Sequence, residues 1–330
     1  MFTSIASIAF LLTTPFNLVK SNRIKLIPSG ANILFKVDTK GVVVTGTYQV
    51  NANNTKYDPS VNSDIKKGDI ILSSNNKSIN SIDDLIDTID DNNQLNLSIK
   101  RNGRIENREL KIYYVNDLPR TGLYVKDKVL GVGTLTYIDP KNLIYGSLGH
   151  EVIDNDTTKL VEYKSGQVYY NDVVGIKKGV NSHPGEKISN TEMKDEFGNI
   201  ISINNMGLFG KYNNSIENLK QYEIGYQNEI KKGKATVLTC IKGNNVESFD
   251  IEITDLKKQD LNGIKGMTFK ITDKELLDIS GGVYSGMSGS PIIQNNRIIG
   301  AVTHVLVDNI KYGYALYIEN MLNTQYSSVY

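Results

Sequence analysis

The stretch Gly281–Val305 constrains this chain more than any other. Its centre reads Gly286-Met287-Ser288-Gly289-Ser290-Pro291, so a serine stands with glycine close on both sides. Glycine has no Cβ, so it adopts turn conformations that other residues avoid and lets another backbone come close. We therefore predict that Ser288 sits on a tight turn. The N–H groups of Gly286 and Ser288 would then point at one place, as is needed to bind the oxyanion of an acyl-transfer intermediate.

The residues after this turn predict a β-hairpin. A short apolar strand, Pro291–Gln294, leads through a polar turn into a β-branched strand, Ile298–Val302. A G-x-S-G-x-P turn that leads into such a hairpin resembles the nucleophile region of chymotrypsin-like serine peptidases. The alternative is a Gly/Ser-rich β-turn without chemistry, which requires neither the proline nor the hairpin.

Histidine is scarce, which narrows the search for a catalytic base. The three candidates are His150, His183 and His304. His150 follows two apolar, strand-like runs and precedes Ser288 in the chain, which is the chymotrypsin-like order. A histidine at a strand end is often structural, but here we predict that His150 takes the proton of Ser288 and later gives it to the leaving amine. His304 is expected to line the substrate cleft, and His183 to face solvent on a turn.

A third group should orient the base and stabilise its charged form. The candidates are Asp154, Asp156, Asp273 and Asp278. A chymotrypsin-like order places the acid between base and nucleophile and far from both, whereas Asp273 lies between them but close before Ser288. Its neighbours alone favour another interpretation, in which Asp273 is the N-cap of a helix over Lys274–Asp278.

A second organised region precedes the histidine. In Ile65–Ile89, a Gly-Asp turn starts a buried strand, an Asn-Lys turn follows, and Ser81 is placed to N-cap a helix with one apolar face. Residues Leu95–Tyr113 then predict a hairpin around Asn102-Gly103. This order is similar to the PDZ domains of exported bacterial proteases, which bind an extended peptide as an added strand. The alternative is a small α/β domain without a ligand.

Composition excludes several classes of function. The formal net charge is +1 and no block of one sign is present, so the chain lacks the basic footprint of a nucleic-acid-binding protein. The only cysteine, Cys240, excludes an intramolecular disulfide and a multi-cysteine metal site. We expect neither a metal nor a cofactor. Residues 116–330 contain short strand-like runs separated by Gly, Asn and Asp, which indicates a β-sandwich or barrel.

The first residues are ambiguous. Phe2–Val19 is mostly apolar but diluted by polar residues, so it is a marginal membrane span. Its positive charges follow it at Lys20, Arg23 and Lys25, whereas a secretory signal carries them in front and the positive-inside rule argues against export. We nevertheless expect residues 1–23 to be an uncleaved export anchor, because the rest of the chain resembles an exported protein.

Four separated motifs together resemble the SpoIVB peptidases, the stage IV sporulation proteins B of endospore-forming bacteria. The motifs read GSLGHEVIDND around His150, PGEK at Pro184–Lys187, TDKELLDISGG from Thr272 and GMSGSPIIQNNRIIGAVTHV from Gly286. The segment IKLIPSGANILFKV from Ile24 and the PDZ-like region also lie where that family has them. The resemblance therefore covers essentially the whole chain.

The resemblance implies a serine endopeptidase of trypsin-like, double β-barrel fold in residues 116–330. It implies a PDZ domain over 30–115, a membrane anchor over 1–23, and a catalytic triad of His150, Asp273 and Ser288. Such an enzyme is made in the forespore, is exported to the space between forespore and mother cell, and processes itself. It cleaves a membrane-bound regulator of an intramembrane protease, so that a late sigma factor is activated.

The expected partners are therefore a protein substrate and a peptide ligand of the PDZ domain, without nucleic acid. A competing hypothesis is a PDZ-based peptide-binding scaffold whose peptidase-like domain is not catalytic. The pairing of His150 with the Ser288 turn favours the enzyme, because a scaffold requires neither residue.

Overall fold

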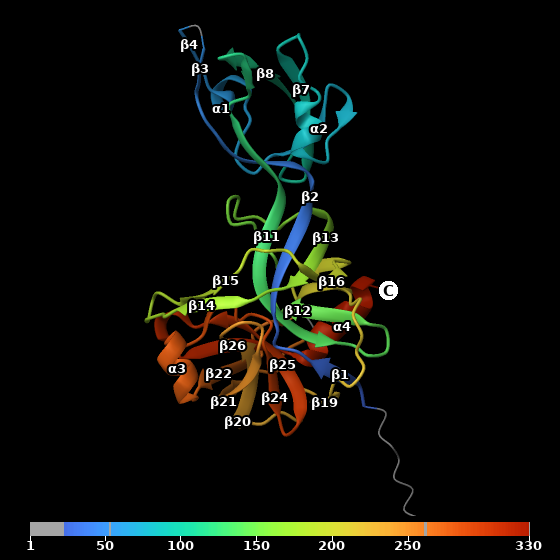
Figure 1. Ribbon diagram of the computed structural model, residues 1–330, viewed down its shortest axis with the longest axis vertical. Helices are drawn as coiled ribbons and strands as arrows, with labels where there is room; N and C mark the ends of the chain where they lie inside the picture. Colours follow the sequence, from blue (N-terminus) through green and yellow to red (C-terminus); the bar gives the residue numbers. More distant parts are fainter. Residues whose placement is uncertain (1–22, 53, 261–262, 330) are drawn as a thin grey trace, which may run out of the picture.

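The computed structural model describes residues 23–329 with gaps at 53 and 261–262. It shows a small N-terminal unit at the top of Figure 1 and two β-barrels below it. Two long strands, β2 (Asn32–Thr47) and β11 (Leu123–Ile138), pair antiparallel and run from the N-terminal unit into the first barrel. The predicted fold class, mainly β with a double barrel, is confirmed.

The first barrel is built around β2 and β11. Its other strands are β12 (Ile144–Leu148), β13 (Tyr163–Tyr170), β16 (Asp195–Asn199) and β18 (Gly207–Lys211), with β17 (Ser202–Asn204) in a hairpin with β18. Neighbouring strands are antiparallel, and an isolated bridge between Gly198 and Tyr212 closes the ring. Side chains alternate between the two faces of a strand, so every second residue, such as Ile33 and Leu135, enters the core.

The second barrel is a closed ring of six strands. They are, in the order of pairing, β20 (Gly233–Cys240), β21 (Val246–Leu256), β22 (Met267–Ile271), β26 (Tyr312–Tyr317), β25 (Arg297–Val305) and β24 (Pro291–Gln294), which pairs again with β20. Closure leaves no open edge inside the ring. Val237, Ile251 and Phe269 belong to its buried core. The predicted hairpin after Ser288 is β24–β25.

Short elements join the two barrels. β1 (Lys25–Pro28) pairs with β11 of the first barrel and with β19 (Tyr222–Ile224), which pairs with β25 of the second. Helix α4 (Ile318–Val329) covers this junction, where Leu26, Phe209 and Leu316 share one apolar cluster. The hairpin β14 (Val173–Lys177) and β15 (Gly185–Ser189) leaves the first barrel, and β15 pairs with β23 (Tyr284–Ser285), just before the predicted nucleophile.

The N-terminal unit has its own apolar core, which includes Val44, Ile71 and Leu97. Its elements after β2 are β3 (Val50–Ala52), β4 (Thr55–Tyr57), α1 (Pro59–Asn62), β5 (Ile70–Ser74), β6 (Lys77–Ser78), α2 (Ile82–Ile86), β7 (Gln94–Arg101), β8 (Arg104–Lys111), β9 (Tyr113–Val115) and β10 (Leu118–Arg120). The predicted hairpin around Asn102-Gly103 is β7–β8.

Ser81 caps helix α2 as predicted. Its hydroxyl accepts a hydrogen bond from the Asp84 N–H, and the Asp84 carboxylate accepts one from the Ser81 N–H, which completes a capping box. The predicted apolar face is shorter than expected, because the helix ends at Ile86, whose side chain is 53% exposed. The residues that follow include Asp87, Asp90, Asp91, Asn92 and Asn93, and Asp and Asn favour turns over helix.

The structure places the boundary between the units differently from the predicted ranges of 30–115 and 116–330. Asn32–Asp38 pairs with Lys128–Thr134 in the first barrel, so the start of β2 belongs to the barrel. Residues 118–120 form β10 of the N-terminal unit, just before the other end of β11. The boundary therefore crosses two continuous strands. No change in composition marks such a crossing, because one extended strand serves both units.

The predicted anchor at residues 1–23 lies, except for Arg23, outside the described residues. Within the described part of the chain, no helix is long and apolar enough to cross a membrane.

Candidate active site

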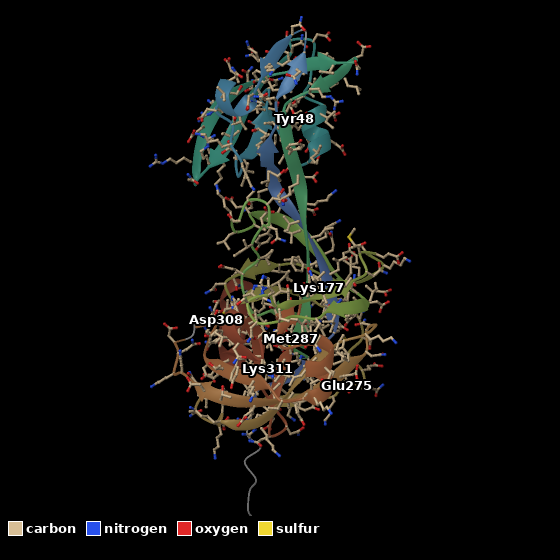
Figure 2. The ribbon with its side chains drawn as sticks, turned by 90° about the vertical axis from the view of Figure 1, so that its left-hand side faces the viewer. Tyr48, Lys177, Glu275, Met287, Asp308 and Lys311 are labelled. Carbon is tan, nitrogen blue, oxygen red and sulfur yellow. The ribbon has the colours of Figure 1, made fainter. Side chains whose placement is uncertain are left out.

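Two glycines shape the turn that carries Ser288. Gly286 and Gly289 both have φ of +92°, a conformation that side chains with a Cβ rarely adopt. A Cβ on Gly289 would lie 2.2 Å from the carbonyl oxygen of Thr134, so this position also has no room for one. Figure 2 shows Met287, the neighbour of Ser288, inside the body of the barrels and well below Tyr48 of the N-terminal unit. The Met287 side chain is fully buried, which anchors the turn.

In this structure the Ser288 hydroxyl is hydrogen-bonded to the backbone rather than to a base. It donates a hydrogen bond to the backbone carbonyl of Thr303 at 3.0 Å. A carbonyl oxygen cannot remove the proton, so attack requires the hydroxyl to leave Thr303 and turn to a base.

His150 follows β12 and is poised as a neutral imidazole. Its Nδ1 lies 2.7 Å from the backbone carbonyl of Glu151. Because a carbonyl only accepts, this contact requires the proton on Nδ1 and leaves the Nε2 lone pair free to act as a base. Burial lowers the pKa of His150 below its usual value, and the hydrogen bond and charge of Glu151 oppose that shift. The ring is therefore predominantly neutral at physiological pH.

The residues predicted to carry out the catalytic step line one cleft. His150, Gly286 and Ser288 line a cleft of about 690 Å³ together with residues of β11 and β15. Among the hydrogen bonds of the described residues, none is donated by the N–H of Gly286 or of Ser288. Both donors are thus available for a substrate oxygen, as an oxyanion-binding site requires. The structure brings the predicted base, nucleophile and oxyanion residues to one place.

Asp273 has a different environment. Its carboxylate accepts hydrogen bonds from the Leu276 N–H at 3.0 Å and from the Asp250 N–H at 3.4 Å. It is the N-cap of α3 (Lys274–Ser280), so the helix-cap interpretation is confirmed, although the helix runs two residues further than predicted. The charge that acts on the His150 pKa is that of Glu151. The described contacts do not bring Asp273 to His150, and its membership of the triad stays a prediction from the resemblance.

The carboxylates of two further acidic candidates are also engaged elsewhere. Asp154 and Asp156, on the loop that follows His150, both form ion pairs with Lys126 on β11. Asp278 accepts a hydrogen bond from Lys178 through its backbone carbonyl, a contact that does not involve its carboxylate. In the described part of the chain, no carboxylate forms a hydrogen bond with His150.

His304 lies closer to His150 than its sequence context indicated. Its ring centroid lies 5.5 Å from that of His150, and its Nδ1 is buried without a hydrogen-bond partner among the described residues. Burial, with the charges of His150 and Lys265, lowers the pKa of His304 to about 4. A neutral neighbour does not oppose the charge that His150 acquires during catalysis. His183 is exposed on a turn, as predicted.

Two substitutions at Asp273 distinguish its role as a helix N-cap from its predicted role as the charged acid of the triad. We expect Asp273→Ala to lower the free energy of unfolding by about 1 kcal/mol, because the N-cap is lost. Asp273→Asn should stay within a few tenths of a kcal/mol of the parent, because asparagine also caps. Urea unfolding measures both values. Equal stability of the alanine variant and the parent would contradict the cap.

The Asp273→Asn variant also tests whether Asp273 belongs to the catalytic triad. Because Asp273→Asn keeps the cap, any loss of kcat in a protein of unchanged stability comes from the missing carboxylate charge. A loss near 10⁴-fold, the size associated with the acid of a serine triad, would support the triad that the resemblance implies.

Comparison with known proteins now identifies the family. The family model described as SpoIVB peptidase S55 matches residues 118–322, which is more than half of the chain. Among solved structures, the active form of the Rv3671c protease from M. tuberculosis is similar, with 17% identity, a TM-score of 0.36, and coverage of 61% of this chain and 74% of that one. The HtrA-type protease AlgW with a decapeptide has 11% identity, a TM-score of 0.35, and coverage of 62% and 54%.

No curated protein matches the chain. The family match covers the histidine, the serine turn, α3 and the strands of both barrels except β2, which precedes residue 118. Its members are serine peptidases, in agreement with the chemistry of the cleft. The chain belongs to the SpoIVB peptidase family.

Proposed function

We propose that this chain is a signalling endopeptidase of sporulation that processes itself and then cleaves a membrane-bound regulator of an intramembrane protease. The observation that carries the proposal is the cleft shared by His150, Gly286 and Ser288. The family name supports the sporulation role, and the cleft supports a peptide substrate. We also propose export to the space between the forespore and mother-cell membranes, as the family resemblance implies.

The geometry supports the following chemical course. A substrate peptide enters the cleft, and the Ser288 hydroxyl leaves the Thr303 carbonyl and gives its proton to Nε2 of His150. Ser288 Oγ attacks the peptide carbonyl, and the N–H groups of Gly286 and Ser288 receive the oxyanion. His150 then protonates the leaving amine, which frees the first product and leaves an acyl-enzyme that water hydrolyses.

The Glu151 carbonyl takes part of the role that a carboxylate has in the usual triad. It accepts the Nδ1 proton of His150 at 2.7 Å, so it fixes the tautomer and the ring orientation. A neutral carbonyl stabilises an imidazolium less than a carboxylate does.

We propose further that the N-terminal unit is a PDZ domain that binds a peptide ligand. The support is the order of its elements, in which strand β5, strand β6 and the Ser81-capped helix α2 follow one another. Helix α2 also lies against β11, since the Ile82 N–H donates to the Asp127 carboxylate at 3.0 Å. A peptide strand beside α2 would thus lie near the strand that continues into the first barrel.

Self-processing is tested by supplying one chain as the substrate of another. We expect the full-length Ser288→Ala chain, incubated alone, to keep its intact mass. The same chain should be shortened when the wild-type protein is added, because only the active copy holds the nucleophile. Intact-mass spectrometry over time measures both. Shortening of the alanine chain alone, at the wild-type rate, would assign the cleavage to another protease.

The sporulation role is tested in an endospore-forming bacterium that lacks its own SpoIVB peptidase. The wild-type chain should restore conversion of the late sigma factor from its pro-form, and Ser288→Ala should not; immunoblotting of the sigma factor measures this. Failure of the wild-type chain, with self-processing intact, would show a peptidase with another substrate.

A further inference from the structure

Thr134, on strand β11, contacts the catalytic turn from the opposite barrel. Its hydroxyl donates a hydrogen bond to the carbonyl of Gly286 at 2.9 Å, and its N–H donates to the carbonyl of Ser288 at 3.0 Å. Thr134 is fully buried. We propose that Thr134 is the positioning residue that holds the oxyanion-binding groups in place. This inference rests on the proposed roles of Ser288 and Gly286.

The two acceptors of Thr134 belong to the two residues whose N–H groups would bind the oxyanion. In any residue the N–H and the C=O flank one Cα, so a fixed carbonyl, together with the φ and ψ of that residue, sets the direction of its N–H. Thr134 therefore orients the N–H groups of both Gly286 and Ser288. A displacement of even a few tenths of an ångström matters, because these donors must meet the oxyanion at 2.7–3.1 Å.

Gly286 requires such an anchor more than an ordinary residue would. It has φ of +92° and no Cβ, so its own backbone opposes rotation only weakly. Its N–H donates no hydrogen bond among the described residues, so that end of the residue is not held. The Thr134 hydroxyl is the recorded hydrogen bond that restrains its carbonyl.

Other contacts keep the threonine itself in place. The Ser290 hydroxyl lies 3.5 Å from Thr134 Oγ1 and is placed to donate to it, which directs the Thr134 proton toward Gly286. Gly289 packs so closely on the Thr134 carbonyl that a Cβ there would lie 2.2 Å from the oxygen. β11 also pairs along its length with β2. The turn is thus fixed to a rigid strand.

The test compares two threonines of the same strand. Thr134→Val removes the hydroxyl while keeping the shape of the side chain, and Thr134→Ser keeps the hydroxyl. Thr136 supplies the matched control: it is fully buried, two residues along β11, and its hydroxyl has no partner among the described residues. Thr136→Val therefore makes the same chemical change without touching the catalytic turn.

We expect Thr134→Val to lower kcat by roughly 10- to 100-fold, since loss of a whole oxyanion donor costs about 10²–10³-fold and here the donors are only misaligned. KM should change less than about twofold. Thr134→Ser and Thr136→Val should both stay within about threefold of the wild type in kcat. A fluorophosphonate that labels the active serine supplies a second readout, whose rate should fall in parallel with kcat. If Thr134→Val does not fold, Thr134→Ala removes the same donor without adding bulk.

Two results would overturn the inference while leaving the nucleophile intact. One is labelling of Ser288 in Thr134→Val at the wild-type rate. The other is an equal loss in Thr134→Ser, which keeps the hydroxyl, and in Thr134→Val; that result would assign the effect to packing at this position rather than to the hydroxyl. Mass spectrometry of the labelled wild-type protein separates these results from failure of the proposed function. A label on another residue would overturn the role of Ser288, and the role of Thr134 with it.

Discussion

Ser288→Ala is expected to lower kcat by about 10⁵-fold or more, with little change in stability. The acyl-enzyme cannot form without Oγ, and the N–H groups of the turn alone provide only a small residual acceleration. The folded state should tolerate the change, because the hydroxyl makes a single hydrogen bond, to Thr303. Cleavage of a protein substrate measures kcat, and thermal unfolding measures stability.

Ser285→Ala is the matched control for this variant. Ser285 is exposed on β23, three residues before Ser288, and should keep kcat within about twofold. If Ser288→Ala retained activity close to the wild type, another residue would be the nucleophile. Absence of cleavage by the wild-type protein itself would instead favour the competing scaffold hypothesis.

His150→Gln is expected to have the second largest effect, a loss of about 10⁴- to 10⁶-fold in kcat. Glutamine fills similar space and can still donate to the Glu151 carbonyl, but it cannot take the proton of Ser288. His304→Gln is the control, because it changes the same type of residue 5.5 Å away and should leave most of the activity. Equal losses in the two variants would contradict the assignment of His150 as the base.

The pH dependence of kcat/KM in the wild-type enzyme should reflect the ionisation of His150. Catalysis requires neutral His150, so kcat/KM falls as pH falls through the pKa of this residue. Burial lowers that pKa below 6.5, so the acidic limb of the profile should lie below pH 6.5. Assays of kcat/KM between pH 4 and 8 measure it. An acidic limb centred above pH 6.5 would indicate that His150 is paired with a carboxylate in the free enzyme in solution.

Such a result would bear on Asp273. In the resting structure its carboxylate caps α3 and the Glu151 carbonyl orients His150. A carboxylate that stabilised the imidazolium would raise the pKa of His150, whereas burial lowers it. The pH profile and the Asp273→Asn variant thus examine the same question through independent measurements.

Much of the local structure follows from the sequence alone. The glycines around Ser288, the hairpin after it and the caps at Ser81 and Asp273 were all predictable, because turns and caps depend on residues within about four positions of each other. The order of His150 before Ser288 similarly indicated the chemistry. The double barrel was predictable as a class, since regular short strands separated by turn residues have few ways to bury their apolar faces.

Contacts between distant parts of the chain were decided by the tertiary structure. Nothing in the neighbourhood of Thr134 indicates that it holds the carbonyls of Gly286 and Ser288, more than 150 residues later. The same holds for the approach of His304 to His150. Closure of two barrels against each other determines which strands meet, and hydrogen-bond register then determines which residues face each other. Local signals therefore determined the parts of this catalytic site, and barrel closure determined how they are assembled.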